Sequence, residues 1–106
     1  MFYNKEIEIW NIGEGFKDSD GIYHEGELEK TKTLMVDIQP YSTERLKKDY
    51  GYEIDVNRRI FCDLDSGIDI NTVIKYKDYN NKELELEVKK VLPWDNYMEV
   101  FCLDVI

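Results

Sequence analysis

Alanine is absent from this 106-residue chain, which also has only one histidine, two cysteines and two prolines. Because Ala is the strongest helix former, its absence beside eight Tyr and four Phe favours strands over helices. No apolar run approaches the roughly 20 residues of a membrane-spanning helix, and residues 1–6 contain no apolar signal core. We therefore expect a soluble protein, made in a cytoplasm, with no membrane partner.

The chain also lacks the residue sets that bond-making chemistry needs. Its only histidine, His24, lies beside Glu25, and no nucleophile motif accompanies it. There is no glycine loop for phosphate and no spacing that identifies a catalytic carboxylate pair. We predict that the protein is not an enzyme, that it needs no cofactor, and that His24 is a solvent-exposed loop residue.

Two acidic clusters are candidates for metal sites. Asp63, Asp65 and Asp69 alternate as carboxylates do in calcium loops, but a third ligand before Gly67 and a distant bidentate Glu are missing. The cluster at residues 18–21 fits a calcium loop less well. Turns use Asp, Ser and Gly for backbone reasons alone, so we predict no metal site and keep calcium at the first cluster as an alternative.

Basic residues are too few for a general nucleic-acid binder. The chain has 23 acidic residues against 14 basic ones and a net charge of -9. DNA phosphates repel such a domain unless its Lys and Arg residues cluster on one surface. Small basic clusters do occur at Arg45, Lys47 and Lys48 and at Arg58 and Arg59. They are typical of solvated faces, but they could contact a DNA backbone or an acidic neighbouring subunit. An acidic wall past which DNA slides is a further possibility.

Alternating apolar residues predict a single mainly β domain over residues 1–106. The expected strands cover about residues 5–12, 28–39, 52–64, 73–79, 84–88 and 97–105. Arg58 interrupts the third, so two strands or a bend near Asn57 are expected there. Six or so short strands fit a small β-barrel or a sandwich.

The segments between the first strands have distinct compositions. Residues 13–26 contain four glycines and predict a long loop. We expect this loop to expose three apolar side chains, those of Phe16, Ile22 and Tyr23.

A short helical insert is expected after Pro40, which ends the preceding strand. Ser42 can cap a helix over Thr43–Tyr50, and Gly51 can take the left-handed stop position. Leu46 and Tyr50 would share one face of this helix.

The C-terminal third is rich in apolar residues on both faces of its last strand. We therefore expect this strand to be central or covered by a partner chain. Cys62 and Cys102 lie in strand patterns without CxxC spacing and predict reduced, buried residues. Trp94 is either a core aromatic that closes one barrel end or an interface anchor.

The order of several turn and aromatic motifs resembles a known family. These motifs are Asp20-Gly21, Val36-Asp37-Ile38-Gln39-Pro40-Tyr41-Ser42, Leu46-Lys47-Lys48-Asp49-Tyr50-Gly51, Arg59-Ile60-Phe61-Cys62-Asp63 and Val91-Leu92-Pro93-Trp94-Asp95-Asn96-Tyr97-Met98-Glu99-Val100. Over about residues 6–105 the chain is similar to the head-closure proteins of tailed phages and prophages of Gram-positive bacteria. These proteins are also called stopper, head-tail joining, minor capsid or head-tail connector proteins.

The resemblance implies a small β-barrel protomer, with about six strands and one short helix in a loop insert. It implies a virion protein of a tailed phage, a prophage or a phage-tail-like particle, assembled in the bacterial cytoplasm. Protomers would form a ring, typically a dodecamer, in the neck below the portal and adaptor. This ring would close the channel of the packaged double-stranded DNA, without sequence specificity, and join the tail-terminator protein.

The resemblance assigns a role to the insert, and the exposed aromatic residues indicate an interface. By position, the insert from Tyr41 to Tyr52 would be the channel gate, with Tyr41, Arg45, Lys47, Lys48 and Tyr50 as its site residues. Since two-turn helices are marginal in water, we expect the insert to be mobile in a free protomer and dispensable for the barrel. Interface residues would be Phe16, Tyr23, Trp94 and Tyr97. The alternative is a monomeric SH3-like or OB-like module that binds a peptide or nucleic acid.

Overall fold

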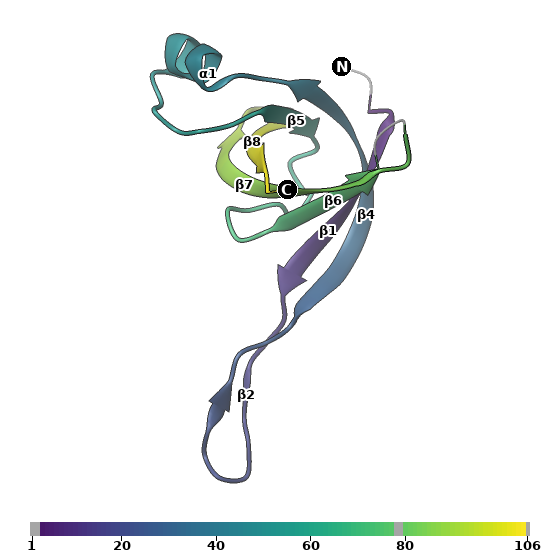
Figure 1. Ribbon diagram of the computed structural model, residues 1–106, viewed down its shortest axis with the longest axis vertical. Helices are drawn as coiled ribbons and strands as arrows, with labels where there is room; N and C mark the ends of the chain where they lie inside the picture. The colour runs from purple at the N-terminus through teal and green to yellow at the C-terminus, as the bar shows by residue number, and fades with distance from the viewer. Residues whose placement is uncertain (1–2, 78–79, 106) are drawn as a thin grey trace.

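The computed structural model describes residues 3–77 and 80–105 and contains, over these residues, a closed antiparallel barrel of six strands and one helix (Figure 1). Around the barrel the order is β1-β4-β5-β8-β7-β6, and β6 pairs with β1 to close it. The barrel strands are β1 (Lys5–Ile12), β4 (Leu28–Pro40), β5 (Arg58–Cys62), β6 (Val73–Lys77), β7 (Glu83–Pro93) and β8 (Met98–Asp104). The predicted mainly β barrel with one short helix is confirmed.

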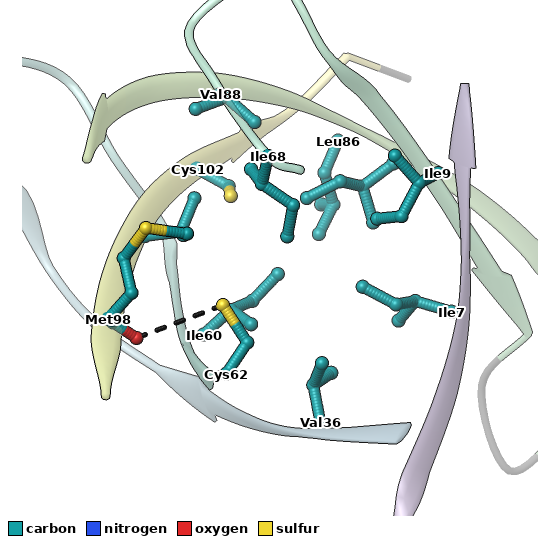
Figure 2. Close-up of a cluster of buried hydrophobic side chains, with 12 residues drawn as sticks. Ile7, Ile9, Val36, Ile60, Cys62, Ile68, Leu86, Val88, Met98 and Cys102 are labelled. Atoms are coloured by element: carbon teal, nitrogen blue, oxygen red, sulfur yellow. Dashed lines mark hydrogen bonds between the residues drawn. The ribbon is translucent and has the colours of Figure 1, made fainter. Parts of the chain in front are cut away.

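The barrel interior is filled by one side of each strand, because side chains alternate between the two faces. Ile7, Ile60 and Leu86 have no exposed surface, and Figure 2 shows them among the side chains that gather inside the barrel. Ile68, from the loop between β5 and β6, is also buried in this cluster. Cys62 and Cys102 are both buried and unpaired, as predicted.

Strand β8 is central, and it is covered by its own chain. It pairs with β5 on one side and β7 on the other. Its inward residues, such as Val100, belong to the barrel core, whereas Phe101 belongs to a second buried cluster outside the barrel. Of the two alternatives expected for this strand, the central position is therefore the one observed, and the chain itself buries Phe101 on the outer face.

The second cluster is built by the insert, residues 41–57, which includes helix α1 (Thr43–Tyr50). Ser42 caps the helix by accepting the Arg45 N–H at 3.1 Å, and Gly51 has a φ of 78° in the left-handed region. Both caps and both helix bounds agree with the prediction. Leu46 has no exposed surface and packs in this cluster with Phe101.

The predicted strand over residues 52–64 is wrong for its first part. Only Arg58–Cys62 pair in the sheet, as β5. The alternating side chains Tyr52, Ile54 and Val56 pack against the insert cluster instead, so alternation there reflects burial beside a helix. The bend expected near Asn57 is present: its N–H donates to the Cys102 carbonyl at 2.9 Å, and its Oδ1 accepts from the Asp104 N–H at 2.9 Å.

Other strand bounds differ from the expectation in detail. Strand β6 ends at Lys77, and the rest of the predicted strand, residues 78–79, lies outside the described residues. The return strand is longer than residues 84–88, because β7 continues to Pro93 through an irregularity between Val88 and Lys90. No helix among the described residues has the length and apolar content to cross a membrane.

Candidate functional site

A hairpin arm, residues 13–27, projects from the barrel where β1 and β4 leave it (Figure 1). The expected loop at residues 13–26 is therefore partly ordered into strands β2 (Phe16–Lys17) and β3 (Tyr23–His24), which pair with each other in a separate sheet. The molecule measures 52 Å along its longest axis against 32 and 30 Å along the others. The arm is thus a protruding element that buries little surface against the barrel.

Glycines let the two strands of the arm approach each other closely near the point where the arm leaves the barrel. A Cβ atom at Gly26 would overlap the Gly13 carbonyl, and one at Gly15 would overlap the Tyr23 side chain and the His24 carbonyl. The Gly13 N–H donates to the Glu27 carbonyl at 2.9 Å beside this approach. Close backbone contact therefore requires glycine here and fixes the path of the arm.

Asp18 organises the tip of the arm. Its Oδ1 accepts the N–H groups of Asp20 at 2.9 Å and Ile22 at 3.0 Å, and its Oδ2 lies 2.8 Å from His24 Nε2. The bonds from His24, then Ile22 and Asp20, hold the pKa of the Asp18 carboxyl below its usual value. The imidazole of His24 also stacks on Phe16, with centroids 4.9 Å apart. The tip is therefore a hydrogen-bonded turn.

Large apolar side chains remain in solvent along this arm. Phe16 is 60% exposed, Ile22 59% and Tyr23 61%, and Ile12 at the root is 65% exposed. His24 is exposed as predicted, although it is also tied to Asp18. The predicted interface residues Phe16 and Tyr23 thus both lie on one projecting element, together with Ile22. Because Phe16 pairs with His24 and Tyr23 pairs with Lys17, Phe16 and Tyr23 lie on opposite faces of the hairpin.

The insert packs firmly on the barrel. Tyr41, only 5% exposed, and Tyr50 both contact Phe101, with ring centroids 5.4 and 5.7 Å apart. Thr43 Oγ1 donates to the Val56 carbonyl at 3.3 Å and accepts the Val56 N–H at 3.2 Å. The expectation of a mobile insert that the barrel does not need disagrees with this packing, because removing the insert would expose Phe101.

The proposed gate residues therefore divide into two groups. Tyr41 and Tyr50 point to the insert cluster, whereas Arg45, Lys47 and Lys48 are exposed. Arg45 lies 3.5 Å from the Asp49 carboxylate, and Lys47 Nζ lies 3.0 Å from the Glu53 carboxylate. Local acids thus offset most of the basic cluster that the sequence singled out.

A row of ring contacts runs from the insert across β5 to the turn between β7 and β8. The successive pairs are Tyr52–Tyr50, Tyr50–Phe101, Phe101–Tyr41, Tyr41–Arg59, Arg59–Phe61, Phe61–Tyr97 and Tyr97–Trp94. The Arg59 guanidinium lies 4.5 Å from the Tyr41 centroid and 4.8 Å from that of Phe61. At the far end Trp94 is 44% exposed, which agrees with an interface anchor better than with a core aromatic.

Sequence reasoning did not single out Glu99, which lies beside this row, and it named Arg59 only as part of a small basic cluster. Glu99 is only 4% exposed, and its carboxylate accepts a hydrogen bond from the Tyr50 hydroxyl at 3.1 Å. Arg59 donates to the Gln39 side chain at 2.7 Å, while its buried Nε has no hydrogen-bond acceptor among the described residues. Glu99 stands among apolar residues in its strand, which was the signal available in the sequence for a buried carboxylate.

A groove of about 620 Å³ lies over β1, β6 and the start of β7, lined by charged residues of both signs. Opposite charges face each other across neighbouring strands here: Glu8 is paired with Lys75, and Lys75 with Glu85. Lys30 Nζ lies 3.2 Å from the Glu8 carboxylate. This alternation is typical of a solvated sheet face.

At residues 63–69, the site of the calcium alternative, the polar groups make hydrogen bonds that stabilise turns of the backbone. Asp69 Oδ1 accepts the Asn71 N–H at 2.8 Å, and the Ser66 N–H donates to the Asp63 carbonyl at 3.2 Å. Within residues 3–77 and 80–105, no three His, Cys, Asp or Glu side chains come together as metal ligands.

No family model and no curated protein matches this chain. Among solved structures, the chain is similar to the solution structure of protein SF1141 from Shigella flexneri 2a, with a TM-score of 0.75 and 18% sequence identity. The match covers 97% of this chain and 93% of that one. At this identity the likeness shows a common fold, which extends over nearly the whole of both chains.

Proposed function

We propose that this protein is a structural component of the head-tail connector of a tailed phage, a prophage or a phage-tail-like particle. Copies of the chain would form a ring that closes the DNA channel below the portal and adaptor and joins the tail. The family resemblance of the ordered motifs motivates this proposal, and the closed barrel is the fold that the resemblance implies.

The observation that carries the proposal is the separation of two exposed aromatic surfaces on one small barrel. The arm presents Phe16 and Tyr23, and the turn between β7 and β8 presents Trp94 against Tyr97. Because a neck ring must contact both its own copies and the components above and below it, a protomer with two separate contact surfaces suits that position. Aromatic residues supply much of the energy of such contacts.

The charge of the chain supports passage of DNA without adhesion. Each phosphate contact would add salt-dependent affinity, and a net charge of -9 keeps such contacts few. The insert can line the DNA channel in this proposal without binding DNA tightly. Its Arg45 and Lys47 are paired with carboxylates of the same segment, which reduces their attraction for phosphates.

The mass of the purified full chain and electron microscopy of the particle test the proposal. The expected results are a ring of copies in the particle neck and, without this protein, heads that package DNA but leak it or fail to hold tails. A strictly monomeric protein absent from particles, whose gene has no portal, capsid or tail genes beside it, would reject it in favour of the monomeric binding module.

A further inference from the structure

We propose that the arm tip docks into an apolar pocket rimmed by Lys and Arg on a different protein. The inference rests on the proposed function in one respect: it takes this partner from the connector components that flank the ring. The docking element is the hairpin tip, which presents Phe16 on one face, Tyr23 on the other and Ile22 beside the turn, with acidic residues around them, so that a pocket would enclose the tip from both faces. Neither the resemblance nor the likeness to a solved structure assigns an occupant to this tip.

The tip has the properties of a preformed recognition element. Three bonds to the Asp18 carboxylate fix the turn, and the Asp18 N–H donates to the Ile22 carbonyl at 3.0 Å. Such a turn holds exposed Ile22 and Tyr23 in one arrangement before any contact is made. Preorganisation lowers the ordering cost of binding, so the exposed side chains can contribute to affinity.

Charge decides which partner suits the arm. Residues 13–27 carry five acidic residues and one lysine, so about four of the nine net negative charges lie on this segment. The acids are Glu14, Asp18, Asp20, Glu25 and Glu27, and the lysine is Lys17. An apolar tip within this negative field is complementary to an apolar pocket with a positive rim.

A second copy of this chain lacks that complementarity. The rest of the chain keeps five net negative charges, so two copies repel each other at long range. Five of its basic side chains are also engaged locally, each within 4 Å of a carboxylate of the same chain: Lys30, Arg45, Lys47, Arg58 and Lys89. The same negative field disfavours nucleic acid and anionic membrane surfaces.

Photocrosslinking during particle assembly identifies the occupant. The full chain, with photoreactive benzoylphenylalanine in place of Ile22, is expressed together with its neighbouring genes and irradiated. The expected adduct contains one defined connector protein. That protein, produced alone, is then the probe for affinity measurements with the unmodified chain at several salt concentrations.

Charge reversal tests the chemistry of the contact. Asp20→Lys combined with Glu25→Lys should weaken binding of the captured protein by about tenfold, because like charges then meet across the rim. Asp55→Lys combined with Asp65→Lys changes the net charge equally on exposed loops of the body and should leave the affinity within about twofold. Binding should also weaken as salt is raised.

Adducts to a second copy, to nucleic acid or to nothing would overturn the inference, as would equal affinities of the two charge variants. A second-copy adduct within a neck ring would leave the proposed function intact. A captured protein unrelated to a connector, bound with the expected charge dependence, would support the docking chemistry and contradict the connector role. Circular dichroism of each variant shows that the barrel, which the arm scarcely contacts, is still folded.

Discussion

The Tyr50 hydroxyl donates a hydrogen bond to the Glu99 carboxylate at 3.1 Å, joining the end of helix α1 to the start of strand β8. The two residues are 49 positions apart in the chain. Glu99 is almost fully buried, so its carboxylate has little access to water. The Tyr50 hydroxyl supplies the hydrogen-bond donor that this buried group needs. This bond adds one polar contact to the apolar packing that holds the insert against the barrel.

Tyr50→Phe should lower the free energy of unfolding by about 1.5–3 kcal/mol, the range for a buried hydrogen bond to a charged group. Urea unfolding measures the change. Tyr52→Phe is the matched control, because Tyr52 stacks on Tyr50 through its ring alone in the described contacts. Equal stability of the Tyr50 variant and the native chain would mean that Glu99 reaches another donor.

Leu46→Ala should cost about 2–5 kcal/mol, since this side chain is fully buried and its removal leaves a cavity beside Phe101. Lys48→Ala, on the exposed face of the same helix, should change stability by less than about 0.5 kcal/mol. Hydrogen exchange should show the Leu46 amide protected with the barrel. Rapid exchange there would restore the mobile insert that the sequence suggested.

Tyr41 should resist ionisation in the folded protein. Burial, followed by its hydrogen bond to Asp49 at 2.7 Å, raises its pKa to about 12. A raised pKa stabilises the fold fully below the ordinary tyrosine value of 10 and loses this contribution as pH rises through about 12. Absorbance titration of the native chain against Tyr41→Phe should therefore differ only near and above pH 12.

The order of the arm tip should depend on pH through Asp18. Its lowered pKa means that the turn is stabilised above the ordinary carboxyl range and loses this stabilisation as pH falls through the lowered value. The NMR amide signals of Asp20 and Ile22 report this transition. In Asp18→Ala these signals should move toward unstructured values at neutral pH, while barrel signals such as that of Val100 stay unchanged.

Both thiols should react slowly with a thiol reagent in the native protein and rapidly in denaturant. Burial raises the pKa of both Cys62 and Cys102, and Cys102 is the more deeply buried of the two. We expect Cys102 to be the slower. Mass spectrometry of the labelled protein distinguishes the two sites, and a native disulfide would contradict the prediction.

Local patterns determined much of this fold from the sequence alone. Alternation at Leu34, Val36 and Ile38 predicts which side of β4 faces the core, because one period-2 face must be buried. Ser42 and Gly51 predict both ends of α1, because caps satisfy backbone groups within a few residues. The buried, unpaired cysteines followed from the same local logic.

Tertiary structure decided which long-range surfaces meet. The alternation of Tyr52, Ile54 and Val56 signals burial but not the neighbour that buries them, so a helix-facing segment was predicted as a strand. A two-turn helix is marginal alone, and only its packing on Phe101 explains how it is held. The loop at residues 13–26 forms an ordered arm because Gly26 allows the two strands to approach closely and because Asp18 accepts hydrogen bonds across the turn. The amino-acid composition of the loop does not reveal either contact. Glu99 and Tyr50 came together only when the barrel closed, since contacts between distant residues depend on topology rather than on local pattern.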